Sequence, residues 1–176
     1  MKKACILLLA VAIITLSAVE FIGNNFSVHT EYLRIHIRAN SNDEADQEVK
    51  YAVKDEIVSF LTPLLSDCDT KEKAESVLKE NLSNVESVAS AVLKKNGKTY
   101  KASAKIKNEE FPTRKYENLT LESGYYDALI VNLGSGEGDN WWCVVYPPLC
   151  FVGTGKYEYK SKIKEIIDRF FYKGER

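Results

Sequence analysis

Apolar and polar residues alternate strictly from Tyr32 to Ala39. A period of two is typical of a half-buried strand, because successive side chains point to opposite faces. The pattern predicts an inner row and an outer row of side chains, which are Leu33, Ile35 and Ile37 on one face and Arg34, His36 and Arg38 on the other. We expect the outer row to be either a solvated strand face or a recognition stripe.

Helical spacing of apolar residues follows this strand in two stretches. Ser41 to Glu44 has the form of a capping box and predicts the start of a first helix, which Pro63 ends or kinks. A second capping signal, Asp69 to Glu72, predicts the start of a long second helix. Asn96 and Gly97 end it, since Gly97 suits the left-handed cap position. The two helices are expected to form a hairpin.

After the second helix the pattern returns to strands. Residues 100–107 predict a second strand with a basic outer face, residues 124–133 a third and residues 141–146 a fourth. The stretch 108–123 predicts a long connection, which is functional or packs as a flap. Apolar residues on one face between 163 and 171 predict a C-terminal helix.

The order of these elements predicts an α+β fold. We expect a mainly antiparallel sheet of about four strands, with two long helices and a C-terminal helix packed on one face. The N-terminus has a different character, because Lys2 and Lys3 precede the uncharged apolar run Ala4–Val19. Residues 1–22 are therefore expected to be a signal peptide or an N-terminal membrane anchor. In either case residues 30–173 should form a single extracytoplasmic α+β domain.

Charge and motifs limit the kinds of ligand that the chain is expected to bind. The chain has 24 Lys and Arg against 25 Asp and Glu, a net charge of −1, which argues against nucleic acid as the partner. The glycine-rich run Gly134–Gly138 lacks the Lys-Ser/Thr of a phosphate-binding loop and no helix pattern follows it, so a strand connection is favoured. Nothing in the pattern predicts a metal or a cofactor.

The stretch Asn140–Cys150 holds both tryptophans and two of the four cysteines. If Tyr146 to Leu149 turns the chain, Cys143 and Cys150 can approach each other and form a disulfide; two buried free thiols are the alternative. Thiol catalysis would need a nearby imidazole, and the chain has only His29 and His36.

The two tryptophans of this stretch, Trp141 and Trp142, are adjacent on the predicted fourth strand. They must point to opposite faces, so at most one enters the core. The other is a binding anchor, or it is covered by the flap.

Three blocks resemble the stage II sporulation protein R family of endospore-forming bacteria. They are LRIHIRANSNDEADQEVKYAVKD at Leu33–Asp55, FPTRKY at Phe111–Tyr116 and GYYDALIVNLGSGEGDNWWCVVYPPLCF at Gly124–Phe151. The chain departs from the family pattern at Leu121–Gly124, where the family tends to have Leu-Pro-Ala-Gly, and Cys68 is peculiar to this sequence.

The resemblance implies a signalling role without catalysis. Such proteins are made in the forespore and exported into the space between the forespore and mother-cell membranes. There they activate a membrane-embedded aspartic protease that processes the pro-form of sporulation sigma factor E. The candidate partner-binding residues in these blocks are Arg34, His36, Arg38, Asn40, Phe111, Arg114, Trp141 and Trp142. The alternatives are a thiol-dependent hydrolase of cell wall or peptide, and a structural wall-associated domain.

Overall fold

The computed structural model describes residues 31–116 and 119–149. Within these ranges the chain forms two compact units: a main unit, residues 31–109 and 126–149, and a hairpin unit, residues 110–116 and 119–125. The expected N-terminal segment, the expected domain limits at residues 30 and 173 and the expected C-terminal helix lie outside the described residues.

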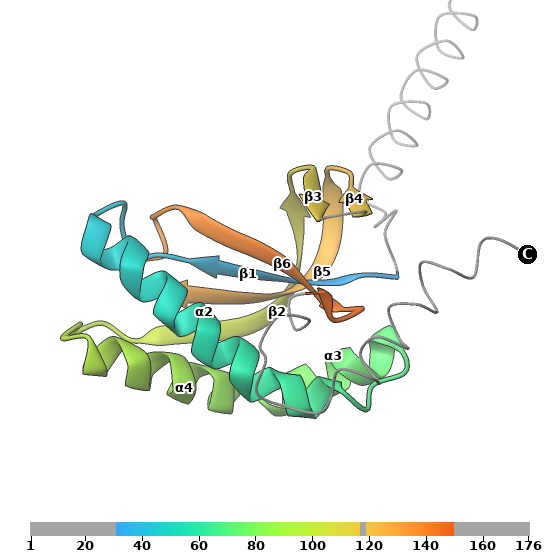
Figure 1. Ribbon diagram of the computed structural model, residues 1–176, viewed down its shortest axis with the longest axis horizontal. Helices are drawn as coiled ribbons and strands as arrows, with labels where there is room; N and C mark the ends of the chain where they lie inside the picture. Colours follow the sequence, from blue (N-terminus) through green and yellow to red (C-terminus); the bar gives the residue numbers. More distant parts are fainter. Residues whose placement is uncertain (1–30, 117–118, 150–176) are drawn as a thin grey trace, which may run out of the picture. The chain divides into compact units, whose positions relative to one another are not determined.

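The main unit is built on a four-stranded sheet (Figure 1). Its strands, in the order β2-β5-β1-β6, are β2 (Ala102–Phe111), β5 (Gly124–Leu133), β1 (Leu33–Arg38) and β6 (Asn140–Tyr146). β1 runs parallel to β5 and antiparallel to β6. The predicted α+β class is confirmed, but the sheet is mixed, because the parallel β1–β5 pair departs from the mainly antiparallel arrangement that was expected. Alternation along a strand indicates which side chains share a face, but it carries no information about the direction of the neighbouring strand.

Three helices lie on one side of this sheet: α2 (Glu44–Leu65), α3 (Lys71–Glu80) and α4 (Leu82–Lys95) (Figure 1). The predicted long second helix is divided at Asn81, whose side-chain amide donates to the Val77 carbonyl at 2.9 Å. The sequence missed this break because the apolar spacing continues through it. α2 extends two residues beyond Pro63.

The helix caps were predicted with mixed success. The predicted start of α3 within Asp69–Glu72 is confirmed: Thr70 is the N-cap residue, and its hydroxyl accepts from the amide of Lys73 at 3.2 Å. Gly97 has the expected left-handed conformation, with φ of 73°. The capping box at Ser41 is wrong. Asp43 is the N-cap residue of α2 and makes no side-chain cap, whereas Ser41 donates its hydroxyl to Asp46.

The core of the main unit lies between the sheet and the helices. The buried apolar side chains of β1, α2 and α4 are Leu33, Ile35, Ile37, Val49, Val53, Ile57, Val58, Leu61, Leu65, Val85, Ala89 and Leu93. The inner row of β1 is thus confirmed. The outer row is only partly solvated: Arg34 is 0% exposed and His36 is 4% exposed. β1 lies in the middle of the sheet, so side chains from neighbouring strands surround both of its faces.

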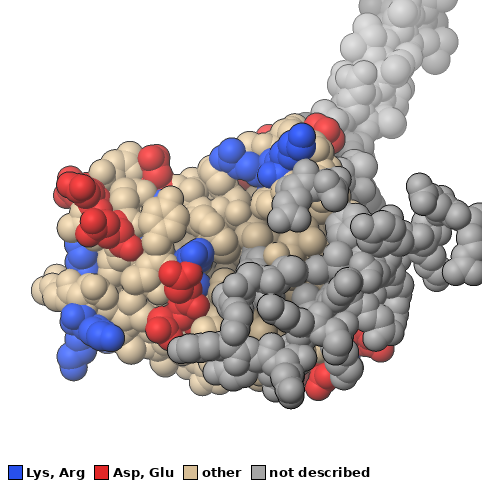
Figure 2. Space-filling view, viewed as in Figure 1, with Lys and Arg blue, Asp and Glu red and all other residues tan. Residues whose placement is uncertain are grey.

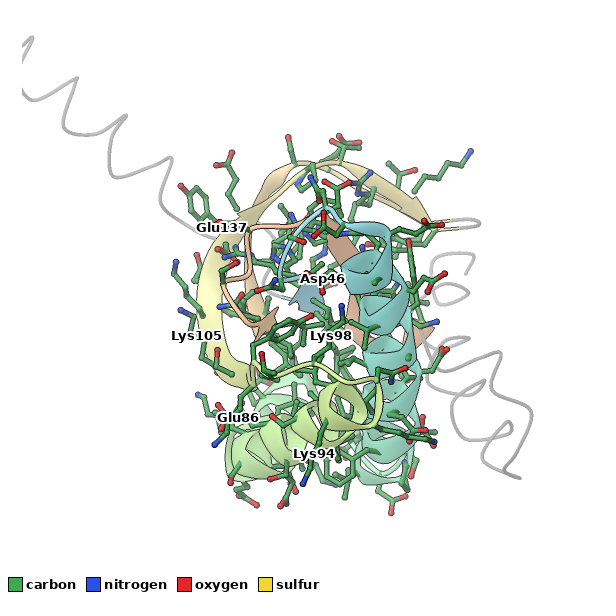
Figure 3. The ribbon with its side chains drawn as sticks, turned by 90° about the vertical axis from the view of Figure 1, so that its left-hand side faces the viewer. Asp46, Glu86, Lys94, Lys98, Lys105 and Glu137 are labelled. Carbon is green, nitrogen blue, oxygen red and sulfur yellow. The ribbon has the colours of Figure 1, made fainter. Side chains whose placement is uncertain are left out.

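Side chains of α4 bind two backbone amides at the start of the edge strand β2. The amide of Ala102 donates to the Ser90 hydroxyl at 3.1 Å, and the amide of Ala104 donates to the Glu86 carboxylate at 2.8 Å. Figure 3 shows Glu86 on α4 beside this strand. Backbone donors at a sheet edge need partners, and here a helix supplies two of them.

The hairpin unit contains the short antiparallel strands β3 (Arg114–Tyr116) and β4 (Leu119–Leu121). The sequence predicted an irregular connection here, whereas β2 continues to Phe111 and a two-stranded sheet follows. Thr113 accepts a hydrogen bond from the amide of Ser123 at 3.0 Å. Phe111 and Leu121 are buried, while Arg114 and Lys115 are exposed and form a basic patch over the hairpin (Figure 2).

None of the helices in the described part of the chain combines the length and the apolar character needed to cross a membrane.

Candidate functional site

The first polar cluster of the main unit is centred on the carboxylate of Asp46, in the first turn of α2. Four side chains donate to it: Asn40 at 2.8 Å, Ser41 at 2.7 Å, Lys98 at 2.6 Å and Tyr100 at 2.6 Å. We call these five residues the Asp46 cluster. Asp46 is 5% exposed. Figure 3 shows Asp46 and Lys98 facing each other between α2 and the α4–β2 turn.

The donors of the Asp46 cluster set its ionisation. Burial by itself would raise the pKa of Asp46, but the hydrogen bonds from Lys98, Tyr100, Asn40 and Ser41 outweigh it and hold the pKa far below its usual range. Burial and the hydrogen bond to the Asp46 carboxylate raise the pKa of Tyr100. Asp46 is therefore a fixed anion at any pH above its own low pKa. It is a poor general acid or base near neutrality, and its role is to hold chain segments together.

The glycine-rich connection between β5 and β6 is fastened to the same place. The amide of Ser135 donates to the Asn40 side chain at 3.0 Å, and the Ser135 hydroxyl donates to the Asn40 carbonyl at 2.7 Å. A Cβ at Gly134 would lie 2.2 Å from the Asn40 side chain, and one at Gly138 would lie 2.2 Å from the Ser41 carbonyl oxygen. These two glycines are required by the close approach of the connection to the segment between β1 and α2.

Lys50 secures the far end of this connection. Its ammonium group is buried and donates to the Asp139 carbonyl at 3.1 Å and to the Gln47 side chain at 2.6 Å. Burial lowers the pKa of Lys50, and the charge of Asp139 acts in the opposite direction. The glycine run thus joins two strands in a fixed position, in agreement with the predicted strand connection.

The second polar cluster lies on the sheet face away from the helices and is centred on Glu109 of β2. One carboxylate oxygen accepts from Arg38 Nη2 at 2.5 Å, and the other lies 3.4 Å from His36 Nδ1. Trp142 lies beside His36, with ring centroids 5.2 Å apart. We call His36, Arg38, Glu109 and Trp142 the sheet-face cluster. It is more open than the Asp46 cluster, since the Arg38 side chain is 28% and the Glu109 side chain 17% exposed.

The sheet-face cluster contains the only histidine of the described range. Burial lowers the pKa of His36 and outweighs the opposing effects of Asn140 and Glu109. Burial would raise the pKa of Glu109, but Arg38 and His36 hold it below its usual value. At neutral pH the cluster therefore holds a neutral imidazole beside an ion pair.

The two tryptophans separate as predicted, to opposite faces of β6. Trp142 is paired with His36 in the β1–β6 register, whereas Trp141 is paired with Ile37 and lies under the Lys54 ammonium of α2, 5.9 Å from the ring centroid. Both rings are half-buried. Only Trp142 belongs to the sheet-face cluster.

The other candidate residues are distributed over different places. Asn40 belongs to the Asp46 cluster, and Arg34 is buried with its guanidinium 4.7 Å from the centroid of the Tyr126 ring. In the hairpin unit Phe111 is buried and Arg114 is exposed. The structure therefore brings together three of the eight candidates, His36, Arg38 and Trp142.

The cysteines do not form a thiol–imidazole pair in the described part of the chain. Cys143 is disulfide-bonded, and its expected partner Cys150 lies outside the described residues. Cys143 is paired with Ile35 in the register, on the opposite face from His36. Cys68 is a buried free thiol whose sulfur lies 3.7 Å from the Leu64 carbonyl. Burial raises the pKa of Cys68, which disfavours the reactive thiolate.

A shallow hollow of about 280 Å³ lies beside the Asp46 cluster, lined by Ala45, Glu48, Val49, Asn96, Gly97 and Lys98. Its only cationic lining side chain, Lys98, is already held by Asp46. Within residues 31–116 and 119–149 no group of three His, Cys, Asp or Glu side chains is placed to hold a metal ion.

Sequence reasoning missed the two carboxylates that organise the clusters. Asp46 occupies an ordinary polar position of a helix, and its donors Lys98 and Tyr100 are more than fifty residues away. Glu109 fell in a stretch expected to be a connection. One sequence signal could have indicated that the two segments around Asn40 and Gly134 lie together. Both segments fall within blocks of the family resemblance, and they are in contact in the structure.

Comparisons with known proteins agree with that resemblance. The family model described as stage II sporulation protein R matches residues 29–156. Stage II sporulation protein R of Bacillus subtilis (strain 168) is 33% identical over 137 residues, which cover 78% of this chain and 60% of the relative. The chain thus spans about 60% of the length of the curated relative that it matches. No solved structure matches the chain.

Proposed function

Because the chain belongs to the stage II sporulation protein R family, we propose that it is an exported signalling ligand of the forespore. In this proposal it enters the space between the forespore and mother-cell membranes. There it binds the extracytoplasmic part of a membrane-embedded aspartic protease and favours the active state of that protease. The protease then processes the pro-form of sporulation sigma factor E. A ligand shifts such an equilibrium only by binding one state more tightly than the other.

The observation that carries this proposal is the extent of the family match. It covers residues 29–156 and so includes every described residue of both units. The disulfide at Cys143 supports export, because disulfides persist in oxidising compartments outside the cytoplasm. It also argues against the thiol-dependent hydrolase, since a sulfur held in a disulfide is not a nucleophile.

The surface that we propose for the protease is the sheet-face cluster. It combines a half-buried tryptophan, an arginine and partial exposure, which are features of residues that dominate binding energy at interfaces. The Asp46 cluster is unsuitable as a contact surface because its donors are already used within the fold.

The experiment is capture of the full-length chain by the extracytoplasmic part of the protease, with two matched variants. Trp142→Ala should weaken capture by about tenfold or more if Trp142 is an interface anchor. Trp141→Ala removes the same side chain from the other face of the same strand and should leave capture within about threefold of the parent. Circular dichroism and thermal melting establish that both variants are folded.

The two variants can also be compared in sporulating cells that lack their own activator. There they should differ in how fast the sigma factor is processed. Trp142→Ala should slow processing, and Trp141→Ala should not. Equal capture and equal processing by the two variants would refute this surface. Failure of the unaltered chain both to bind the protease and to promote processing would refute the signalling role.

A further inference from the structure

The sheet face that carries Glu109 also carries a row of lysines. Side chains alternate along β2, so Lys105 and Lys107 share a face with Glu109. The ion pair between Lys107 and Glu109, with a nitrogen–oxygen distance of 3.9 Å, agrees with this placement. Figure 3 shows Lys105 pointing away from the helices. We call Arg38, Lys105, Lys107 and Glu109 the basic sheet face.

The charge of this face is unbalanced. Three cationic side chains stand against the single carboxylate of Glu109, which contacts two of them, Arg38 and Lys107. Lys105 is exposed, and the Lys107 side chain is 55% exposed. Lysines on an edge strand also discourage strand pairing. That role alone does not require Arg38 of β1 and Trp142 of β6, which lie on the same side of the sheet.

The way in which Glu109 is bound indicates the chemistry that fits here. Arg38 holds a carboxylate oxygen at 2.5 Å, and the imidazole of His36 lies beside the other oxygen at 3.4 Å. The cluster is therefore built to receive a carboxylate, and the chain supplies one of its own. Arginine pairs strongly with carboxylates because its planar group offers several donors. Trp142 adds an aromatic surface next to this position.

We propose that the basic sheet face binds a short acidic segment of a partner protein, and that Glu109 occupies the position of a partner carboxylate until that segment arrives. This inference rests on the proposed function for the identity of the partner, but the acidic chemistry comes from the face itself. Glu109 then acts as an internal competitor. Removing its charge should strengthen binding, whereas reversing a lysine charge should weaken it.

The direct test uses a fluorescein-labelled peptide of ten glutamates and the full-length chain in a mild detergent. Fluorescence anisotropy is measured at an ionic strength of about 20 mM, where screening is weak. A glycine-serine peptide of equal length controls for nonspecific binding. We expect the acidic peptide to bind and the neutral one not to bind. Affinity should fall steeply as salt is raised to about 300 mM.

Three variants sharpen the test. Lys107→Glu should weaken binding of the acidic peptide about tenfold, and Glu109→Gln should strengthen it about threefold, because both change the charge that the peptide meets. Lys94→Glu is the matched control: Lys94 is an exposed lysine in the last turn of α4, and Figure 3 shows it at a distance from Lys105. It should change the affinity less than twofold.

The opposite signs at Lys107 and Glu109 distinguish a local site from general charge attraction. Equal effects of Lys107→Glu and Lys94→Glu, or weaker binding by Glu109→Gln, would overturn the proposal. The proposal would also be overturned if the chain bound vesicles of anionic lipid, with the variants in the same order of affinity, and did not bind the acidic peptide. If the peptide does not bind but the protease still captures the chain, this inference fails and the proposed function stands. If the peptide binds as ranked and the protease does not capture the chain, the inference stands and the proposed function fails.

Discussion

The two polar clusters of the main unit are each centred on one carboxylate, yet they differ in how that carboxylate is satisfied. Asp46 accepts four hydrogen bonds of 2.6–2.8 Å from side chains in two separate parts of the chain. Glu109 has one short bond to Arg38 and two longer contacts, to His36 and Lys107. It is also more exposed. The comparison indicates that the first carboxylate serves the fold, whereas the second can exchange partners at modest cost.

The largest expected effect is that of Asp46→Asn on stability. The substitution leaves the Lys98 ammonium without its counter-charge and disrupts the other three donors. The free energy of unfolding in urea should fall by about 3 kcal/mol, as when one member of a buried pair is removed. Glu48→Gln changes an exposed carboxylate of the same helix and should cost less than about 0.5 kcal/mol. A loss below about 1 kcal/mol for Asp46→Asn would contradict the structural role.

The same variant has a defined pH dependence. The pKa of Asp46 is lower in the folded chain, so the unfolded chain takes up the proton more readily. The stability contributed by this group is present above about pH 4 and is lost as the pH falls below it. The difference between the parent and Asp46→Asn should therefore shrink in acid.

The next largest effect is expected at the glycine connection. Gly138→Ala places a Cβ 2.2 Å from the Ser41 carbonyl oxygen, and the backbone must move. We expect a loss of about 2 kcal/mol in the free energy of unfolding. Gly97→Ala is the comparison. Gly97 has a φ of 73° with open space around it, so only the strain of the left-handed conformation remains, about 1 kcal/mol. Equal losses would show that the close approach at Gly138 is unimportant.

A smaller effect is expected at His36 and in a different pH range. Burial lowers the pKa of His36, so the folded chain resists protonation, whereas the unfolded chain binds a proton near pH 6.5. Stability should decline as the pH falls from about 7 to 5.5. His36→Gln should remove that slope while leaving the acid loss due to Asp46 in place. His29 is retained in both proteins, so its contribution cancels. If the stability of His36→Gln declined with pH as steeply as that of the parent, a group other than His36 would be responsible.

The smallest effect is expected from Glu109→Gln on stability. The ion pair with Arg38 is partly exposed, and such pairs contribute at most about 1 kcal/mol. Urea denaturation should therefore give a free energy of unfolding within about 1 kcal/mol of the parent. A loss as large as that of Asp46→Asn would make Glu109 a second structural anchor and would remove the contrast between the two clusters.

The sequence predicted the elements of the main unit better than their assembly. The strands at 33–38 and 124–133 follow from alternation and apolar runs, and the start of α3 from the cap at Thr70. Strand order and the parallel β1–β5 pair depend on contacts between residues about ninety positions apart, which periodicity does not encode. The two long helices became three because Asn81 interrupts an apolar pattern that continues past it.

The candidate site was predicted only in part, because it too depends on contacts between residues that are distant in the sequence. His36, Arg38 and Trp142 were identified from their types and from family resemblance, and the structure places His36 beside Trp142. The carboxylate that joins His36 to Arg38 comes from Glu109, on a strand two places away in the sheet. Arg34 was expected in the same outer row, as part of a solvated face or a recognition stripe, but the central strand β1 is covered on both faces and Arg34 is buried.

The contacts from α4 to β2 affect the tendency of this chain to associate with other copies of itself. Open sheet edges are the usual starting points for runaway self-assembly, because backbone groups attract any matching strand. Ser90 and Glu86 occupy the amides of Ala102 and Ala104 and so remove two backbone donors from the start of the β2 edge. The start of β2 is thereby less able to pair with a strand of another copy.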